Sequence, residues 1–400
     1  MALSKEELNA ATTQLNAAVE AFNSSSDDAN RQSIVSAAER LLLCARDPNT
    51  MWMEDAITMT RLGTIHLFQT WGAFALIPKD SPISIPDLAS QLSADLSLVE
   101  RTVGVLTSLS ILTFQPPNLV SHTPRSLTLL PSNPLCDLYH IMWDNAMVPF
   151  FHLPAYFSAY GRKEPQSTNH IPATFARACP EKAFYEYLAS DPEYFRRFTA
   201  GMAVVESHVP ASGMYDFSKV IEESKKEGNE GRVVLVDVGG GKGQALVAFK
   251  EEFPGLEMGR CVLEDRKEVL EGKGLEGLEG VRREVVDFHE GQPVKGAMVY
   301  FMRRCLHNYS DELATNILRI LVEAMAEDSK ILIQEDVQSV PPSAAEAFLD
   351  ILMMAYGGKQ RSLQCWEKVV QGAGLRISGM FKRPGSTEAL SVIECVKEAL

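Results

Sequence analysis

The sequence predicts an α/β protein with a Rossmann-like parallel sheet in its carboxyl-terminal part and a helical region containing a winged helix before it. Three observations predict this fold: a buried strand near residue 235 that runs into a glycine loop and a helix, acid-tipped strands after it, and a helix, turn, helix, wing order within 83–130. Changes in composition divide the chain into a helical and winged-helix region at 1–130, a helical linker region at 131–215 and the Rossmann-like domain at 216–400.

Composition excludes several classes of protein. The 400 residues suggest two or three domains, and 38 basic against 52 acidic side chains give a net charge of −14, which disfavours binding to a nucleic acid backbone. No apolar run is long enough to cross a membrane, and the polar start MALSKEELNAATTQLN is not a secretory signal. Seven scattered cysteines without a C-x-x-C pair indicate reduced thiols, a cytoplasmic location and no zinc site.

The amino-terminal region begins with two expected helices. The first shows apolar residues at helical spacing, and the run SSSDDAN after it is typical of a break that caps the second helix. Further on, Pro86 and Asp87 open a short helix, a second helix is expected from Leu96 to Leu112, and two β-prone runs follow around a Pro-Asn turn.

This order of elements is that of a winged helix, which in many proteins reads DNA. The second helix carries Glu100 and Arg101 but no cluster of cations for phosphates, so packing or dimerisation fits it better. The following residues, 135–215, are helical and rich in aromatic side chains, which line either a hydrophobic core or a pocket for a flat ligand.

The glycine loop is the most informative segment. The apolar run from Arg232 ends in Asp237, and glycines follow at 239, 240, 241 and 243 before a helical stretch. Neither the dinucleotide fingerprint nor the phosphate-binding P-loop pattern fits, because Gln244 follows Gly243 and Lys242 is followed by glycine. The remaining pattern, an acid followed by alternating glycines, is that of S-adenosylmethionine (SAM) binding, in which a tight turn and a carboxylate suit a zwitterionic methionine tail.

Two further acids follow the loop in the order that a SAM site needs. Asp265 ends the next expected strand, where a carboxylate can bind both hydroxyls of a ribose. Asp287 and Phe288 come at the end of the third expected strand, where side chains lie beside an adenine. A glycine-rich turn without a ligand is the alternative.

From these residues onward the chain resembles the plant and fungal O-methyltransferases of the caffeate and flavonoid type. The resemblance covers roughly residues 40–395 and rests on LVDVGGGKG, VLEDRKEVLEG, YFMRRCLHNYSDE, ILIQEDV and GGKQRS. It implies a homodimer formed through the amino-terminal domain, SAM as cofactor and no metal ion. It also implies a set of cofactor-binding residues: Asp237, Gly239, Gly241, Gly243, Asp265, Asp287, Phe288 and Arg303.

The resemblance further implies that His307 is the catalytic base and that Glu335 orients it. A phenol has a pKa of about 10 and is a poor nucleophile near neutral pH, so a histidine with an ordinary pKa of about 6.5 can assist methyl transfer by taking its proton. Where the family has a second acidic partner, this chain has Gln360, which can form a hydrogen bond but cannot compensate a positive charge. His307 is therefore expected to be a weaker base than in the family. The chain also has Asn308 and Tyr309 where the family has Asp and Trp.

The altered residues leave an alternative open. A subgroup with this fold keeps SAM bound but catalyses pericyclic ring formation, with pocket donors that polarise a conjugated carbonyl. A silent dimer or regulatory protein is the remaining possibility. A small hydrophobic substrate, either phenolic or polyketide-derived, is expected in both enzymes, and its predicted contacts are Trp143, Phe151, His152, Met354 and Arg361.

Overall fold

The structure, a computed structural model, describes residues 4–271, 277–385 and 389–398. It forms two compact units, 1–133 and 134–400. The division that the sequence predicts between 215 and 216 stays a prediction. Within the described residues, no helix has the length and apolar character needed to cross a membrane.

The first unit is mostly helical. Its small antiparallel sheet has the strand order β1-β3-β2. The elements are α1 (Lys5–Ser24), α2 (Asp28–Ala45), η1 (Pro48–Thr50), α3 (Met51–Thr70), α4 (Ala73–Leu76), β1 (Ile83–Ser84), α5 (Ile85–Leu92), α6 (Leu96–Ser108), β2 (Leu112–Gln115), β3 (Leu119–His122) and α7 (Pro124–Leu127). The side chain of Asp27 caps α2, as the SSSDDAN run predicts.

One predicted boundary in this unit is wrong. The helix expected to reach Leu112 ends at Ser108, and Leu112 instead begins β2, where it pairs with His122. Ser110 has a φ of 56°, a left-handed conformation that cannot continue the helix. The observed order of helix, helix and two-stranded ribbon matches the order that the sequence predicts.

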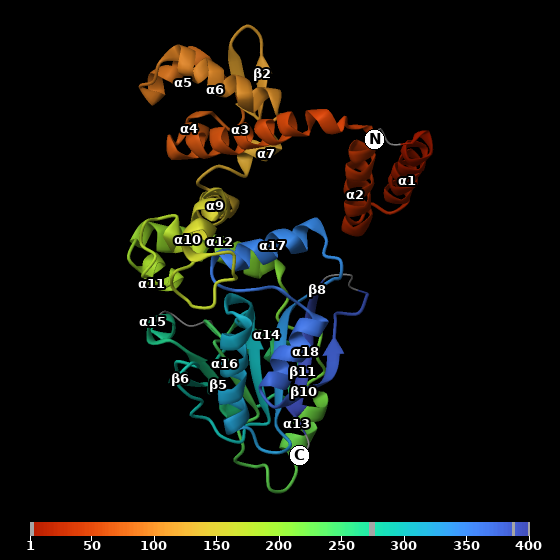
Figure 1. The fold of residues 1–400 in the computed structure, drawn as a ribbon, viewed down its shortest axis with the longest axis vertical. Helices are drawn as coiled ribbons and strands as arrows, with labels where there is room; N and C mark the ends of the chain where they lie inside the picture. Colours follow the sequence, from red (N-terminus) through yellow and green to blue (C-terminus); the bar gives the residue numbers. More distant parts are fainter. Residues whose placement is uncertain (1–3, 272–276, 386–388, 399–400) are drawn as a thin grey trace. The chain divides into compact units, whose positions relative to one another are not determined.

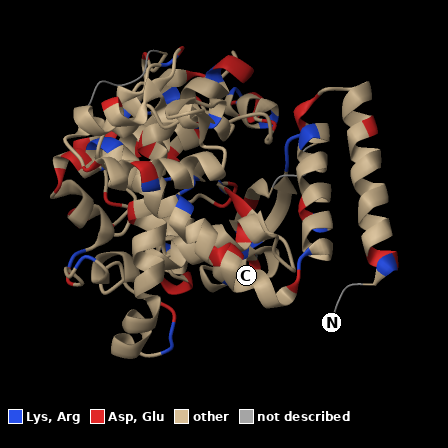
Figure 2. Cartoon of the chain, turned by 90° about the horizontal axis from the view of Figure 1, so that it is seen from above, with Lys and Arg blue, Asp and Glu red and all other residues tan. Residues whose placement is uncertain are grey.

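The α1–α2 hairpin buries little of its own surface. The two helices pack side by side, and Figure 2 shows their charged residues gathered mainly towards the helix ends, with tan stretches between them. Only Ala11 is buried in α1, and no residue is buried in α2.

The second unit begins with helices that precede the large sheet. They are α8 (Pro134–Met142), the π-helix η2 (Trp143–Met147), α9 (Val148–Tyr160), α10 (Pro172–Phe175), α11 (Phe184–Ala189), α12 (Pro192–His208) and α13 (Ser218–Ser224). Their aromatic side chains form several ring contacts, such as that between Phe184 and Tyr356 with centroids 4.5 Å apart.

The sheet has a parallel centre and an antiparallel edge. Its strand order is β10-β11-β8-β7-β4-β5-β6, in which β8, β7, β4, β5 and β6 pair in parallel, and β9 pairs with β8. Its elements are β4 (Leu235–Val238), α14 (Gln244–Glu252), η3 (Met258–Arg260), β5 (Cys261–Asp265), α15 (Lys267–Leu270), β6 (Arg282–Val285), β7 (Val299–Arg303), η4 (Leu306–Asn308), α16 (Asp311–Ala324), β8 (Lys330–Gln338), α17 (Ala344–Ala355), β9 (Arg361–Ser362), α18 (Leu363–Gly372), β10 (Leu375–Phe381) and β11 (Leu390–Lys397).

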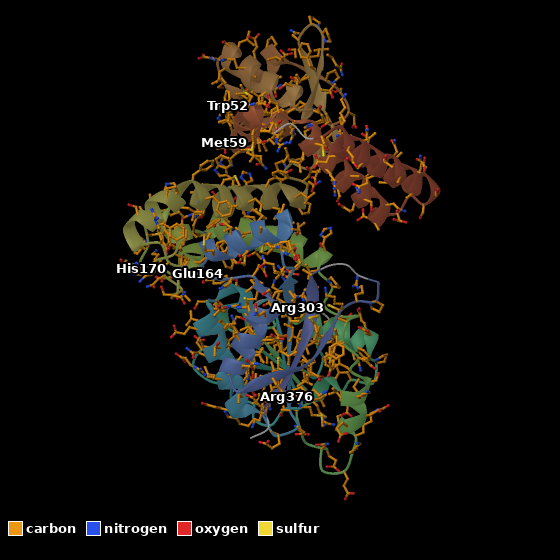
Figure 3. All side chains as sticks on the ribbon, turned by 45° about the vertical axis from the view of Figure 1, so that its right-hand side comes forward. Trp52, Met59, Glu164, His170, Arg303 and Arg376 are labelled. Carbon is orange, nitrogen blue, oxygen red and sulfur yellow. The ribbon has the colours of Figure 1, made fainter. Side chains whose placement is uncertain are left out.

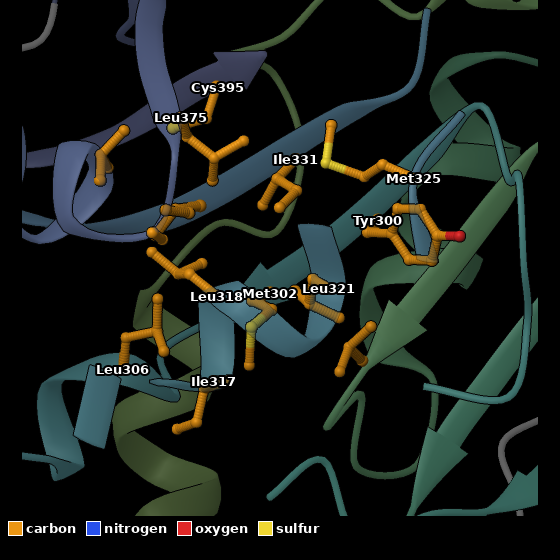
Figure 4. Close-up of a cluster of buried hydrophobic side chains, with 14 of the residues drawn as sticks. Tyr300, Met302, Leu306, Ile317, Leu318, Leu321, Met325, Ile331, Leu375 and Cys395 are labelled. Atoms are coloured by element: carbon orange, nitrogen blue, oxygen red, sulfur yellow. The ribbon is translucent and has the colours of Figure 1, made fainter. Parts of the chain in front are cut away.

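Apolar cores lie on both faces of this sheet. Figure 1 shows the helices α14, α16 and α18 beside its strands. Alternate residues of β7 point to opposite faces, so that Tyr300 and Met302 pack with α16 and α18, whereas Val299 and Phe301 pack with α13 and α14. Figure 4 shows part of the first of these cores. Burial on both faces explains why the central strands β4, β5 and β7 read as largely continuous apolar runs. The parallel sheet confirms the predicted Rossmann-like fold.

Candidate functional site

The site forms where the parallel strands end. The loop between β4 and α14 is left-handed at three of its glycines, with φ values of 67° at Gly239, 62° at Gly241 and 90° at Gly243. A side chain is strained in this conformation, which explains the alternating glycines in the sequence. The loop thus presents bare backbone at the carboxyl end of β4.

The fourth glycine of the loop is needed for a different reason. A Cβ atom on Gly240 would lie 2.4 Å from Cγ and from Oδ2 of Asp237. The loop backbone therefore folds directly over this carboxylate. The sequence interpretation omitted Gly240 from the site, although the run of three glycines was the available signal.

The Asp237 carboxylate is buried without a hydrogen bond. The residue is 1% exposed, and neither carboxylate oxygen has a partner among the described residues. Burial raises its pKa to about 7; the charge of Arg303 opposes this rise, and the charges of Asp265 and Glu264 add to it. A buried, unpaired carboxylate is costly, so this oxygen pair suits a cationic donor such as the ammonium group of an amino acid.

Asp265 closes the other side of the loop. Its Oδ2 accepts the N–H of Gly241 at 2.8 Å, and its Oδ1 accepts the N–H of Arg266 at 2.7 Å. Burial raises the pKa of Asp265, while these two backbone bonds lower it. Each carboxylate oxygen keeps further acceptor capacity, which fits the hydroxyls of a ribose.

Asp287 and Phe288 lie just beyond the end of β6. Asp287 is exposed and accepts the N–H of His289 at 2.9 Å. The Phe288 ring lies against Gly239, because a Cβ there would be 3.3 Å from the ring, and it meets Tyr309 edge-on at 6.0 Å. The structure therefore brings Phe288 to the glycine loop.

Arg303 ends β7, close to the same edge of the sheet (Figure 3). Its Nη1 lies 2.6 Å from Glu206 of α12, and its Nη2 donates to the carbonyl of Val209 at 3.0 Å. The Nε is buried and has no hydrogen-bond partner in the part of the chain that the structure describes. Arg303 is therefore attached to α12 and the residue after it, while its Nε–H stays available as a donor.

His307 and Glu335 form the second part of the site. His307 lies in η4 after β7, and Glu335 lies on the neighbouring strand β8. The ring Nδ1 is 2.6 Å from Glu335 Oε2, and the His307 N–H donates to Oε1 at 3.3 Å. Both side chains are buried, with 10% and 2% exposure. Burial alone would raise the pKa of Glu335, but the charge and hydrogen bonds of His307, with the charge of Arg304, hold it below its ordinary value.

These two parts of the site are adjacent. The thiol of Cys305, two residues before His307, lies 3.3 Å from the carbonyl of Arg303 and 3.7 Å from that of Gly239. Sequence reasoning missed Cys305, and a single cysteine beside a motif offers no pattern that would have indicated this contact. Cys305 therefore places the turn that contains His307 next to the glycine loop.

Arg361 does not lie as predicted, whereas the catalytic role of Gln360 stays a prediction. The Gln360 N–H donates to Asp350, but among the described residues its side chain forms no hydrogen bond with His307. Arg361, expected to face a substrate, is instead fully buried, and its guanidinium bonds Asp311 and backbone carbonyls. A side chain whose donors are used inside the fold cannot face a substrate, so that prediction for Arg361 is corrected.

The other predicted substrate contacts lie on helices of the second unit. Trp143 is part of η2, Phe151 and His152 are exposed on α9, and Met354 is half-buried on α17. The Nδ1 of His152 bonds the carbonyl of Val148 at 2.8 Å. In the described part of the chain, His, Cys, Asp and Glu side chains form no cluster that could hold a metal ion.

A parallel sheet of this order, with a glycine loop over a buried acid and a second acid at the next strand, defines a Rossmann-like protein of the SAM-binding class. Comparisons with known proteins agree with this assignment. A family model described as an O-methyltransferase domain matches residues 163–376. Methyltransferase cfoD of Aspergillus candidus is 32% identical over 378 residues, covering 92% of each chain, and methyltransferase pvhD of Talaromyces variabilis is 36% identical over 324 residues, covering 80% of this chain and 89% of that protein.

Solved structures show the same fold. OxaC superposes with a TM-score of 0.84 at 22% identity, covering 98% of this chain and 100% of its own. LepI, solved in complex with SAM, gives a TM-score of 0.79 at 22% identity, covering 99% and 100%. The chain therefore belongs to the O-methyltransferase family of enzymes, whose cofactor is SAM.

The contact between Gly240 and Asp237 makes a first prediction. Gly240→Ala should lower the affinity for S-adenosylhomocysteine by about tenfold or more, because the added methyl displaces the loop from the carboxylate. Gly259→Ala, at a position with no atom within 4 Å of the added Cβ, is the matched control and should leave the affinity unchanged. Calorimetric titration measures both, and equal affinities in the two variants would contradict the prediction.

The raised pKa of Asp237 makes a second prediction. Because a cationic ligand group binds the ionised carboxylate, affinity for S-adenosylhomocysteine should rise with pH and level off above about 7. Asp237→Asn should bind weakly and lose this rise. Glu264→Gln removes another buried acid whose pKa is raised to about 7. In this variant the affinity should still rise with pH. Titrations between about pH 5 and 8 test this, and a rise that survives in Asp237→Asn would refute it.

Proposed function

We propose that the chain methylates a hydroxyl group of a hydrophobic aromatic or polyketide-type small molecule, with His307 as general base. The observation that carries the proposal is the buried 2.6 Å bond between His307 Nδ1 and Glu335, beside a glycine loop that fits the cofactor. The SAM cofactor supplies a methyl group on a sulfonium, which is a strong methyl donor.

The residues of the chain prepare the acceptor oxygen. An ionised Glu335 can only accept a hydrogen bond, so the proton of the neutral His307 ring stays on Nδ1 and the lone pair stays on Nε2. Among the described residues Nε2 has no hydrogen-bond partner, which leaves it available to take the proton of the acceptor hydroxyl. The lowered pKa of Glu335 keeps a negative charge beside the ring as it becomes positive.

We assign the cofactor's parts to the residues at the strand ends. Asp237 would hold the ammonium group, the backbone of Gly239, Gly241 and Gly243 would follow the methionine chain, and Asp265 would hold the ribose. Phe288 would lie against the adenine with Asp287 at its edge, and Arg303 would add its spare Nε donor. The unpaired oxygens of Asp237 support this assignment most strongly.

For the substrate we propose a pocket that includes Trp143, Phe151, His152 and Met354. The aromatic character of this region supports a hydrophobic, planar substrate. With Nδ1 bonded to Val148, His152 can offer its Nε2 to a polar group of the substrate.

A second candidate function follows from Gln360. Without an acid at position 360, Glu335 is the acid that bonds the His307 ring, which favours a reaction that needs less proton transfer. In that case the bound cofactor would stay intact, and the enzyme would catalyse a pericyclic ring closure by polarising a conjugated carbonyl.

Methyl-deuterated SAM separates these two functions. The protein is incubated with the labelled cofactor and an extract rich in phenols and polyketides, and the products are followed by mass spectrometry. A product that carries the label, with matching S-adenosylhomocysteine, supports methyl transfer and reveals the acceptor. A new product of unchanged mass, with the cofactor intact, supports the ring closure.

Removal of the His307 ring makes a third prediction. His307→Ala should lower kcat for the methylated acceptor by about 10²- to 10⁴-fold, since proton removal is then left to water, whereas affinity for S-adenosylhomocysteine should change little. His208→Ala, at an exposed histidine on α12, is the control for loss of an imidazole. Turnover equal to wild type in His307→Ala would end the assignment of the base.

We further propose that the enzyme is a homodimer formed through its amino-terminal unit. That unit exposes large apolar side chains along successive helices, namely Leu42 (49% exposed), Leu43 (67%), Met51 (64%), Trp52 (65%) and Met59 (52%). Exposed apolar groups at this density are typical of surfaces that a partner covers.

The dimer makes a fourth prediction. Light scattering at micromolar concentration should give twice the chain mass, and Leu43→Glu with Trp52→Glu should give a single chain, because buried charges disfavour the interface. Gln14→Glu with Gln32→Glu adds the same charge at exposed polar positions and should remain dimeric. A single-chain mass for the unaltered protein would refute the proposal.

A further inference from the structure

Arg361 is one of the most completely buried charged side chains of the described chain, with 0% exposure. Its Nε donates to Asp311 at 2.7 Å, its Nη1 to the carbonyls of Leu306 at 3.0 Å and Lys359 at 3.3 Å, and its Nη2 to the carbonyl of Tyr309 at 2.7 Å. Four hydrogen bonds thus fix one rigid, planar group.

Two of these carbonyls belong to residues on either side of His307 in the chain: Leu306 directly before it and Tyr309 two residues after it. The carbonyl of His307 itself accepts the N–H of Lys359 at 2.8 Å. The segment 358–361 can approach so closely only because Gly358 has no side chain: a Cβ there would lie 2.1 Å from the His307 carbonyl oxygen. Segment 358–361 therefore packs directly against the backbone of the histidine turn, residues 306–309, which contains His307.

The opposite side of the turn is held by Glu335. Its carboxylate bonds both the ring Nδ1 and the backbone N–H of His307, so the direction of the ring depends on the orientation of the adjoining peptide groups. Arg361 holds the peptide group before His307 through the Leu306 carbonyl, and the indole of Trp366, 5.1 Å away, covers one face of the guanidinium. Movement of the guanidinium would release the Leu306 and Tyr309 carbonyls together.

We propose that Arg361 is a positioning residue that fixes the direction of the His307 ring by holding the carbonyl of Leu306, directly before it, and that of Tyr309, two residues after it. The proposal rests on the proposed function of His307, since proton transfer requires Nε2 to point at the acceptor hydroxyl. Lysine cannot replace this arrangement, because one ammonium group cannot reach Asp311, Leu306 and Tyr309 in the geometry of a planar fork.

Arg232 supplies a matched control. It also bonds one carboxylate, Asp328 at 2.6 Å, and the backbone carbonyl of Gly296 at 2.6 Å, and its side chain is 17% exposed. It precedes β4 and so lies at the other end of that strand from the glycine loop. Loss of the Arg232 hydrogen bonds should lower the stability of the protein without changing the position of His307.

The test measures the ring proton of His307 by NMR in the full-length protein labelled with ¹⁵N-histidine. Among eight histidines, the resonance is assigned by its absence in His307→Gln. The short bond to Glu335 should place the Nδ1 proton far downfield. In Arg361→Lys this signal should be lost or move upfield, while in Arg232→Lys it should stay in place, although both variants unfold at lower denaturant concentration.

A milder pair of variants decides the question if Arg361→Lys does not fold. Asp311→Asn keeps an acceptor for Arg361 but removes its charge, at a side chain that is 45% exposed, and should shift the signal less in the same direction. Asp328→Asn is its control. An unmoved His307 signal in a folded Arg361→Lys, or in Asp311→Asn where Arg361→Lys does not fold, would overturn the proposal.

This outcome is separate from failure of the proposed function. If His307→Ala turns over at the wild-type rate, His307 is no base, whatever its ring proton shows. If His307→Ala is inactive but the His307 ring signal is unchanged in Arg361→Lys, His307 remains the proposed base and the positioning role of Arg361 is refuted.

Discussion

The bond between His307 and Glu335 is the interaction on which the rest of the site depends, and the register of two parallel strands creates it. Arg303 at the end of β7 pairs with Gln334 of β8, so that the turn after β7 comes beside Glu335. The same edge of the sheet carries the loop after β4 and Asp265 at the end of β5. Parallel pairing thus brings residues far apart in sequence to one edge without any side chain having to reach far.

The parts of the site that could be predicted from the sequence are those with a local sequence pattern. The strand before Asp237, the alternating glycines and the acid at the end of β5 each have a pattern that local chemistry dictates. Gly240 was not predicted, because its need arises from the close approach of Asp237, which no periodicity records. Arg361 was misplaced for a similar reason, since its partners lie about fifty residues away in the chain.

The double glycine before Lys359 shows how a motif can serve packing and chemistry at once. Gly357 adopts a φ of 84°, and Gly358 passes so close to the His307 carbonyl that no side chain fits. The segment therefore brings Lys359 and Arg361 against the histidine turn while the Gln360 side chain stays unbonded to it. An acid at position 360 would add charge beside the histidine, whereas glutamine leaves Glu335 as the acid bonded to the ring.

The buried acids at the carboxyl ends of β4 and β5 also lower the stability of the folded chain when they ionise. Asp237 and Glu264 both have pKa values raised to about 7 by burial, so their ionisation opposes folding. Stability from this source is greatest below the ordinary pKa of a carboxyl and is lost as pH rises towards about 7. A ligand that binds only the folded chain offsets this loss by mass action. Binding of the cofactor should therefore matter most for the stability of the folded chain near and above pH 7, where the buried acids oppose folding.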